Sequence, residues 1–392
     1  MYKIKTFNKI AKIGLDRLSP EEFTISEDHN DPSAIILRSH KLHDMGFNNE
    51  LLAIGRAGAG VNNVPVDKCT EQAIVVFNAP GANANAVKEL VLMGLLLSSR
   101  DVLGGIDYTK TLTGSDDDIS KAVEKSKSLY GGSELQGKTL GVIGLGAIGS
   151  MVANTAINFG MKVLGFDPYI SIDWAWSLNR QVVRADNLVK MLKEVDFLSL
   201  NVPCTESTRS FFNSDKISHI KPGAIVVNFA RPEIVVESDI VDGLNNGRLR
   251  KYITDFPSSL TINHPNVIAV PHLGASTKEA EDNCAIMIAN QIQSFLKTGN
   301  IKNSVNFPTC HLEPSGVNRL AITNKNIPNI LGQVTGLLAH KEYNIAEMLN
   351  KSRGDIAYTL IDTDRKLSED LLNQISDIDG VIRVRLIDLT SI

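Results

Sequence analysis

Short apolar runs alternate with turn-forming residues in the first part of the chain. The runs "SAIILRS", "LLAIGRAGAGVNNV" and "AIVVFNAPGANANA" begin between residues 30 and 80. This succession of strand, loop, helix and strand is typical of an α/β layer. The next stretch, "NAVKELVLMGLLLSSRDV", is so densely apolar that it predicts a helix buried between domains. Residues 104–136 are polar and contain glycine, so we expect a crossing segment and a possible domain boundary there.

The middle of the chain carries a second, more regular alternation. It starts with "KTLGVIGLGAIGSMVANTAINFGMKVLGFDPY" and continues with the apolar strands "VDFLSLNVP", "AIVVNFAR", "KYITDF" and "NVIAVPH". Continuous apolar strands separated by helical stretches predict a parallel, doubly wound sheet. A helix is predicted from residue 277 to a glycine stop near residue 300, and residues 301–316 are expected to form a linker.

Residues 317–392 follow a different pattern. The segments "NRLAITNKN", "YNIAEMLNKSR", "IAYTLIDTD" and "VIRVRLID" predict strands, and "IPNILGQVTGLLAHKE" predicts a helix. A second helix, "SEDLLNQISDI", has Ser368 in position to cap it. The resulting βαββαβ order is the ferredoxin-like arrangement. We therefore predict an α/β protein with two Rossmann-like, doubly wound lobes and a C-terminal ferredoxin-like domain.

Composition narrows the class of protein. A chain of 392 residues predicts two or three domains, and its 43% apolar and 21% charged residues are ordinary for a globular protein. The formal charge of −4 gives no basic surface for nucleic acid. No signal peptide and no apolar run of about 18 residues is visible, which predicts a soluble, cytoplasmic protein without a membrane partner. Four isolated cysteines indicate thiols in a reducing compartment and no metal site; they are Cys69, Cys204, Cys284 and Cys310.

The segment "GVIGLGAIG" contains a candidate phosphate-binding turn. Gly144, Gly146 and Gly149 stand in G-x-G-x-x-G register between a predicted strand and a predicted helix. Glycines permit a tight turn and close approach of a pyrophosphate, and the helix start, with Ala147 and Ile148, offers amide donors. Asp167 ends the next strand, where it can accept hydrogen bonds from an adenosine ribose, which favours NAD. The alternative is a purely structural glycine turn.

Two side chains at predicted strand ends are candidate catalytic residues. Arg231 could grip a carboxylate and polarise a neighbouring carbonyl group. His272 could exchange a proton with that oxygen while a hydride moves to or from nicotinamide. Taken singly, a strand-end ion pair and a structural histidine are the alternatives. The glycine-rich loop "IGRAGAGVNNV" adds Arg56, which could contact a second anionic group or be an ordinary loop arginine.

At this point several segments resemble a known family. "GRAGAGVNNV", "NAPGANANAVKEL", "GKTLGVIGLGAIG", "NFAR" and "PHLGASTKEA" resemble the D-3-phosphoglycerate dehydrogenases of the D-2-hydroxyacid dehydrogenase superfamily. The segment "ITNKNIPNILGQVTGLLAHKEYNIAEM" resembles the ACT domain of the shorter, serine-sensitive form. The resemblance covers nearly the whole chain.

The resemblance implies an NAD-dependent, reversible oxidation of 3-phospho-D-glycerate to 3-phosphohydroxypyruvate, the first step of L-serine biosynthesis. It also implies a substrate-binding lobe over residues 1–97, completed by a returning helix at about 275–305. An NAD-binding domain would span residues 98–274, and an ACT regulatory domain residues 317–392. ACT sheets commonly pair, so the resemblance implies a homodimer or homotetramer.

Roles for individual residues also follow from the resemblance. Arg56 would bind the substrate phosphate, Arg231 the carboxylate and keto oxygen, and His272 would donate and accept the proton. On the substrate side the resemblance adds Asn78, Ser39 and Gly58. On the cofactor side it adds Val202, Pro203, Thr208, Ala230, Gly274 and Asp255, the last near the nicotinamide carboxamide.

The chain departs from the family at two positions close to these residues. Pro232 follows Arg231 where the family has glycine, which biases Arg231 toward extended geometry. The family also has a glutamate partner for the histidine, and this chain has serine and leucine at residues 258–260. Glu233, Glu237 or Glu279 could substitute for it in space, or His272 could work unassisted.

A third departure lies in the ACT motif. Asn324 replaces the usual histidine, whereas Asn326 and Asn344 match the family, so an L-serine effector stays a hypothesis. The alternative is a domain that serves only as an oligomer interface. Two other functions also stay open: another D-2-hydroxyacid dehydrogenase, such as a hydroxypyruvate or glyoxylate reductase, and a catalytically weakened, amino-acid-sensing homologue.

Overall fold

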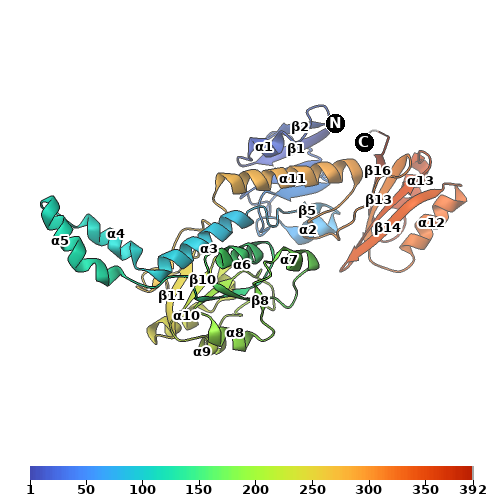
Figure 1. Cartoon of the computed structure of the whole chain (residues 1–392). Helices are drawn as coiled ribbons and strands as arrows, with labels where there is room; N and C mark the ends of the chain where they lie inside the picture. The colour runs from blue at the N-terminus through green and yellow to red at the C-terminus, as the bar shows by residue number, and fades with distance from the viewer. Residues whose placement is uncertain (391–392) are drawn as a thin grey trace. The chain divides into compact units, whose positions relative to one another are not determined.

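The computed structural model describes residues 1–390 and divides into two compact units (Figure 1). The first unit combines residues 1–83 with the chain from residue 278 onward, and the second is Ala84–Thr277. The second unit is therefore inserted into the first. The sequence prediction ended the first lobe at residue 97, whereas the long helix of residues 84–99 packs in the core of the second unit.

A five-stranded parallel sheet forms the centre of the first unit, in the order β2-β1-β3-β4-β5. Helix α11 covers it at close range, because a Cβ on Gly55 would lie 2.5 Å from the side chain of Ile288. The expected α/β layer is confirmed, although the sequence pattern missed the first two strands. The strands are β1 (Tyr2–Phe7), β2 (Phe23–Ser26), β3 (Ala34–Leu37), β4 (Ala53–Arg56) and β5 (Val75–Phe77), and the helices are α1 (Lys12–Leu15), α2 (Val66–Glu71) and α11 (Lys278–Thr298).

The end of the chain folds as a four-stranded antiparallel sheet in the order β14-β15-β13-β16, with the predicted βαββαβ connectivity. One core lies between this sheet and its two helices. Tyr358, Leu360 and Ile387 join the core of the five-stranded sheet instead. The elements are β13 (Asn318–Lys325), α12 (Ile330–His340), β14 (Ile345–Arg353), β15 (Ile356–Thr363), α13 (Glu369–Ser376) and β16 (Val381–Asp388).

The predicted linker at residues 301–316 is packed structure, and that prediction is wrong in this respect. Ile301 and Cys310 exchange backbone hydrogen bonds and are fully buried, as is Phe307 at 1% exposure. The apolar residues of the segment 301–316 therefore fill part of the core of the first unit. Arg319 adds a buried ion pair to Asp362, with Nε 2.6 Å from Oδ1, and also donates to the carbonyl oxygen of Thr298.

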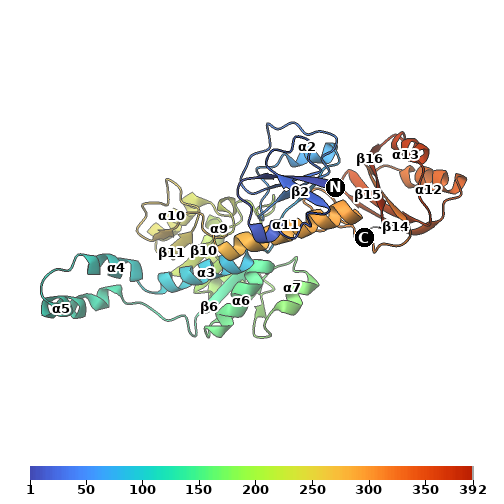
Figure 2. The same cartoon turned by 90° about the horizontal axis from the view of Figure 1, so that it is seen from above.

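The second unit contains the predicted doubly wound sheet, with seven parallel strands in the order β12-β11-β10-β9-β6-β7-β8. Helices α3 and α6 lie side by side (Figure 2). The strands are β6 (Thr139–Ile143), β7 (Lys162–Phe166), β8 (Val183–Arg184), β9 (Phe197–Leu200), β10 (Ala224–Asn228), β11 (Leu249–Thr254) and β12 (Val267–Ala269). The helices are α3 (Ala84–Ser99), α6 (Ala147–Asn158), α7 (Ile172–Ser177), α8 (Leu188–Glu194), α9 (Ser214–His219), η2 (Pro232–Ile234) and α10 (Glu237–Asn245).

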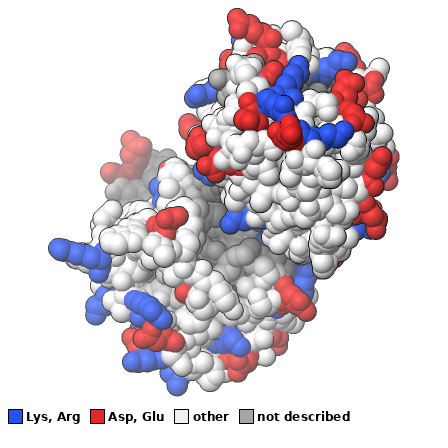
Figure 3. All heavy atoms as spheres, turned by 90° about the vertical axis from the view of Figure 1, so that its right-hand side faces the viewer, with Lys and Arg blue, Asp and Glu red and all other residues white. Residues whose placement is uncertain are grey.

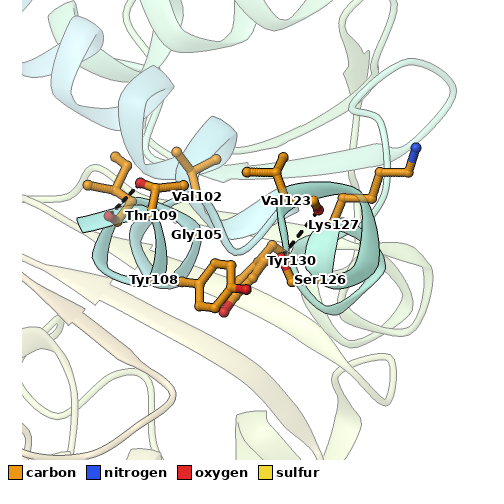
Figure 4. Close-up of a pocket in the computed structure, with 9 residues that line it drawn as sticks. Val102, Gly105, Tyr108, Thr109, Val123, Ser126, Lys127 and Tyr130 are labelled. Atoms are coloured by element: carbon orange, nitrogen blue, oxygen red, sulfur yellow. Dashed lines mark hydrogen bonds between the residues drawn. The ribbon is translucent and has the colours of Figure 1, made fainter. Parts of the chain in front are cut away.

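Residues 102–130 form a helical hairpin, which corrects the expectation of a crossing segment. Ser115 and Asp118 make a complete capping box at the start of its second helix. The rings of Tyr108 and Tyr130 stack at 5.6 Å beside a small pocket that contains none of the candidate site residues (Figure 4). The helices are α4 (Val102–Lys110), α5 (Asp116–Ser126) and η1 (Lys127–Tyr130).

Within residues 1–390, no helix is long and apolar enough to cross a membrane. In the same part of the chain no three His, Cys, Asp or Glu side chains gather as metal ligands, and all four cysteines are free. Basic and acidic side chains are interspersed over the face in Figure 3, without one continuous basic area. This distribution agrees with the small net charge.

Candidate active site

The glycine-rich turn joins β6 to α6 in the second unit. Gly144 has φ +86°, and a Cβ on it would lie 2.7 Å from the carbonyl oxygen of Asn201. A Cβ on Gly149 would lie 1.8 Å from the carbonyl oxygen of Gly144. Gly146 is the N-cap of α6, and no side chain caps that helix. The first amides of α6, including those of Ala147 and Ile148, therefore face a turn that only glycines can make.

Asp167 follows β7 and braces this turn. Its Oδ2 accepts a hydrogen bond from the Leu145 amide at 2.8 Å, and its Oδ1 accepts one from the Tyr169 amide at 2.9 Å. A cavity of about 380 Å³ lies beside the carboxylate, with Arg184 and otherwise mainly apolar side chains in its wall. A cavity of this size can hold part of a small ligand.

The loop after β9 contributes the other predicted cofactor-lining residues. Val202 lies against Gly144, because a Cβ on that glycine would come 2.8 Å from the Val202 Cγ1. The hydroxyl of Thr208 donates to the carbonyl oxygen of Pro203 at 2.5 Å and accepts from the Thr205 amide at 2.7 Å. These bonds close the loop on itself at the same sheet edge as the glycine turn.

Arg231 stands just beyond β10, after Ala230. Its backbone is extended, with φ −154° and ψ 144°, which is the conformation that a following proline favours. The Asn228 side-chain amide donates to the Arg231 carbonyl oxygen at 2.9 Å, and Arg231 Nη1 donates to the Ala230 carbonyl oxygen at 2.7 Å. These contacts hold a half-buried guanidinium group at the carboxyl end of the sheet.

Asp255 follows β11 and is 1% exposed. Its Oδ2 accepts a hydrogen bond from the Gly274 amide at 3.0 Å, while its Oδ1 is buried without a partner among residues 1–390. Burial raises the pKa of this carboxyl group, and the Gly274 amide, His272 and Arg231 oppose that rise. A buried oxygen without a donor is costly, so this atom is suited to accept a hydrogen bond from a ligand.

His272 lies in the loop after β12 and is exposed in its unit. The Phe256 ring meets it edge-on, with centroids 5.0 Å apart and planes at 63°. In the described part of the chain no carboxylate forms an ion pair with His272, so neither Glu233 nor Glu237 replaces the missing glutamate in this way. Ser258 instead hydrogen-bonds to Thr261 within its own loop.

The substrate-side candidates lie in the first unit, at the carboxyl ends of β3, β4 and β5. The Arg56 Nε donates to the Arg38 carbonyl oxygen at 3.0 Å. Gly58 makes room for the guanidinium group, because a Cβ there would lie 2.0 Å from Arg56 Nη1. The Asn78 side chain is anchored on the Ala59 carbonyl oxygen at 2.6 Å, and the Ser39 amide donates to Asn8 at 3.0 Å.

Arg38 was missed by the sequence reasoning, although "AIILRS" ends a strand as "AIGR" does. Its Nη1 lies 2.6 Å from Glu281 Oε1 of α11. Neighbouring strands of a parallel sheet end at the same edge. Arg38, just after β3, and Arg56, at the end of β4, therefore lie side by side. The position of both arginines at predicted strand ends was the feature of the sequence that could have identified Arg38 as a site residue.

The three asparagines proposed for an effector do not come together in one copy of the chain. Asn324 is the residue before the last of β13 and lies opposite Ala357, whereas Asn344 lies next to Ile345, which pairs with Thr363 at the other end of the sheet. The Asn326 side chain donates to the Gly354 carbonyl oxygen at 3.1 Å, on the Asn324 side. The Asn324 Oδ1 is buried and has no hydrogen-bond partner in the part of the chain that the structure describes.

Comparisons with known proteins agree on one kind of enzyme, a dehydrogenase of 2-hydroxyacids. Residues 106–274 match the model of the D-isomer specific 2-hydroxyacid dehydrogenase NAD-binding domain. D-3-phosphoglycerate dehydrogenase of Haemophilus influenzae is 32% identical over 350 residues, covering 86% of this chain and 82% of that protein. The Methanocaldococcus jannaschii protein of the same name is 37% identical over 273 residues, but this chain spans only half of its length.

Among solved structures, NAD⁺-bound 3-phosphoglycerate dehydrogenase of Entamoeba histolytica superposes with a TM-score of 0.58 and 25% identity. The match covers 78% of this chain and 98% of that one. Holo D-mandelate dehydrogenase of Rhodotorula graminis gives a TM-score of 0.66 at 19% identity, which shows a shared fold alone.

Proposed function

Because the chain belongs to the D-isomer specific 2-hydroxyacid dehydrogenase family, we propose that it interconverts 3-phospho-D-glycerate and 3-phosphohydroxypyruvate with NAD. This reaction is the entry step of L-serine biosynthesis. One observation carries the proposal: a glycine turn with its aspartate, an arginine, a buried carboxylate and a histidine all follow strands of a single parallel sheet. Ligands bind such sheets at the carboxyl ends of the strands.

The residues present fit NAD. A Cβ on Gly144 or Gly149 would clash with neighbouring backbone atoms, so these glycines allow the tight turn, and the open space around Gly146 supports the approach of a diphosphate to the start of α6. The position of Asp167 after β7, beside the glycine turn, supports a role in binding the ribose hydroxyls, and the buried Oδ1 of Asp255 is an acceptor suited to the carboxamide NH₂ of nicotinamide. When bound, the cofactor accepts or gives the hydride at C4 of its nicotinamide ring.

Arg231 binds the carboxylate of the 2-hydroxyacid, and His272 transfers the proton of its C2 hydroxyl group. The Arg231 guanidinium group pairs with the substrate carboxylate and polarises the C2 oxygen. In the oxidation, His272 takes the proton of the C2 hydroxyl while the C2 hydrogen leaves as hydride. In the reverse direction His272 returns that proton to the carbonyl oxygen. General acid–base catalysis of this kind contributes about 10²–10⁴ in rate.

Arg56 supports the phosphorylated substrate over a simpler 2-ketoacid. A phosphate dianion requires strong donors, and the chain provides Arg56 with Arg38 beside it in the first unit. A hydroxypyruvate or glyoxylate reductase has no comparable need for them. Gly58 keeps the space around the Arg56 guanidinium group open.

The test is NADH oxidation by the full-length protein with 3-phosphohydroxypyruvate, hydroxypyruvate and glyoxylate. We expect the phosphorylated ketoacid to have the highest kcat/KM, and Arg56→Ala to lower that value about 100-fold or more, as loss of a charge-assisted pair does. Arg17→Ala, at an exposed arginine of the same unit, is the matched control. Equal activity of Arg56→Ala and wild type on 3-phosphohydroxypyruvate would rule out this substrate.

We propose L-serine as an effector that binds between two copies of the C-terminal domain. The separation of Asn324 from Asn344 along the sheet supports a site with contributions from two chains, hence a homodimer or homotetramer. Calorimetry with L-serine and sedimentation of the protein test both parts. Serine binding without NADH oxidation would favour the amino-acid-sensing homologue. The free cysteines fit a cytoplasmic location.

A further inference from the structure

We propose that two buried polar side chains, Asn228 and Tyr252, position the catalytic arginine Arg231. The inference rests on the proposed function, in which the Arg231 guanidinium group binds the substrate carboxylate and polarises the C2 oxygen. Asn228 is the last residue of β10, and Tyr252 lies in the neighbouring strand β11. The two residues are 0% and 1% exposed, so they act through the backbone that carries Arg231 and do not touch a substrate themselves.

The Asn228 side chain holds the backbone on both sides of the Arg231 turn. Its Oδ1 accepts a hydrogen bond from the Ala230 amide at 3.2 Å, and its Nδ2 donates to the Arg231 carbonyl oxygen at 2.9 Å. Between these two contacts lies the Ala230 carbonyl oxygen, which accepts from Arg231 Nη1 at 2.7 Å. A single buried side chain therefore fixes the peptide groups that flank the acceptor of the guanidinium group, where water does not compete for the bonds.

The proline after Arg231 makes this side-chain contact more important. Pro232 has no amide hydrogen, so the backbone directly after Arg231 cannot donate a hydrogen bond. The Arg231 carbonyl oxygen accepts a backbone bond from the Ile234 amide at 3.4 Å. The bond from Asn228, at 2.9 Å, is shorter and therefore stronger. The turn that carries Arg231 thus depends on the Asn228 side chain more than on its own backbone.

Tyr252 holds the Asn228 amide in this orientation. Asn228 Nδ2 carries two hydrogens, and the Tyr252 hydroxyl oxygen, 3.4 Å away, accepts the one that Arg231 does not use. Asn228 pairs in register with Thr254, two residues after Tyr252, so the side chains of all three point to one face of the sheet. Thr254 also hydrogen-bonds to the phenol. Both N–H groups of the Asn228 amide are then occupied, which restrains its rotation.

Two variants remove the two parts of this network. Tyr252→Phe removes only the hydroxyl group and keeps the buried ring. Asn228→Ala removes both hydrogen bonds to the turn that carries Arg231 and takes the donor away from the phenol. Each variant is made in the full-length protein. The assays are kcat and KM for ketoacid reduction, the Kd for NADH, and thermal unfolding.

Two control variants match these changes at sites away from Arg231. Tyr108→Phe also removes a tyrosine hydroxyl group, which donates to the Ala122 carbonyl oxygen at 3.4 Å in the helical hairpin. Asn306→Ala also removes a buried amide that bonds the backbone through both of its polar atoms. Its Oδ1 accepts from the Val76 amide at 2.8 Å, and its Nδ2 donates to the Ile74 carbonyl oxygen at 2.9 Å. A loss of stability alone would therefore appear in these controls without a change in kinetics.

We expect Asn228→Ala to lower kcat/KM for the ketoacid about 10–100-fold, because a displaced guanidinium group stabilises the transition state poorly. Tyr252→Phe should lower it about 3–10-fold, since the Asn228 amide keeps its bonds to the turn but loses one restraint. The Kd for NADH should stay within about twofold of wild type in both. Lysine is a compact point charge without a fork to align. In the Arg231→Lys background, Asn228→Ala should therefore cost less than about 3-fold.

An equal loss of kcat/KM in Asn228→Ala with and without Arg231→Lys would overturn the proposal, because it indicates a general structural role. If Asn228→Ala does not fold, Tyr252→Phe decides, and unchanged kcat/KM would overturn the proposal. Failure of the proposed substrate is distinguishable, since the kinetics can be measured with whichever 2-ketoacid the wild-type protein reduces. If it reduces none, hydrogen exchange of residues 229–235, measured by mass spectrometry, replaces the kinetics. Faster exchange in the two variants than in wild type supports the proposal, and equal exchange overturns it.

Discussion

The glycine turn and the histidine loop of the second unit are held at the same edge of the sheet by different kinds of contact. Both follow strands of one sheet and present groups to a ligand at its carboxyl edge. The turn of residues 144–149 needs only its own glycines and the brace from Asp167. The histidine loop is held by residues from another strand end, through Asp255 and Phe256. A local glycine motif, braced by Asp167 from 22 residues away at a spacing that the motif itself predicts, therefore determines one half of the site. Packing that has no sequence motif determines the other, long-range half.

Gly149→Val tests the local half and should have the largest effect. Any Cβ at this position would collide with the Gly144 carbonyl oxygen, and the turn before α6 would have to open. We expect loss of measurable NADH binding by fluorescence titration, with substantial loss of stability. Gly137→Ala, at a glycine with open space around it but φ +76°, is the control for backbone strain alone. Retained NADH binding in Gly149→Val would show that the turn does not hold the cofactor.

His272→Asn removes the proton carrier from the long-range half. We expect kcat to fall about 10²–10⁴-fold while the Kd for NADH stays within about twofold, because the cofactor contacts lie elsewhere. His264→Asn, on a neighbouring loop with its ring bonded to Asn245, is the matched histidine control. Stopped-flow measurement of a single turnover gives the chemical step directly. A kcat close to wild type would place the proton on another group.

Asp167→Asn probes whether the brace of the turn also selects the cofactor. The amide keeps one oxygen for the Leu145 amide but loses the charge that favours ribose hydroxyls and repels a 2′-phosphate. We expect KM for NADH to rise about 10-fold and the preference for NADH over NADPH to shrink by about 10–100-fold. Unchanged preference in steady-state kinetics with both cofactors would separate bracing from selection.

Pro232→Gly should have the smallest effect. Arg231 already has the extended backbone that the proline favours, so glycine restores the residue of the family without creating a new contact. We expect kcat/KM to change less than about 3-fold and stability to fall by about 0.4–1 kcal/mol through the freer unfolded chain. Urea unfolding and steady-state kinetics measure the two quantities. A large gain in activity would mean that the proline restrains the site.

The same distinction explains how far the amino-acid sequence predicts this molecule. Apolar periodicity identified the six longer strands of the seven-stranded sheet and every element of the C-terminal domain, because those patterns are local. It missed the hairpin of residues 102–130, whose α4 buries no side chain, and the core contribution of Phe307. The bond from Gly274 to Asp255 joins residues 19 apart in the chain, and no spacing rule indicates it.

Insertion of the second unit has a consequence for synthesis. Residues 84–277 are contiguous, so their sheet can form on the ribosome as soon as they emerge. The five-stranded sheet is translated first, yet the helix that covers it at Gly55 is α11, which follows the entire insertion. The sheet of residues 1–83 is therefore covered by α11 only after the whole insertion has been translated. Its apolar face stays uncovered while residues 84–277 are translated. During that time it is the apolar surface available to a molecular chaperone.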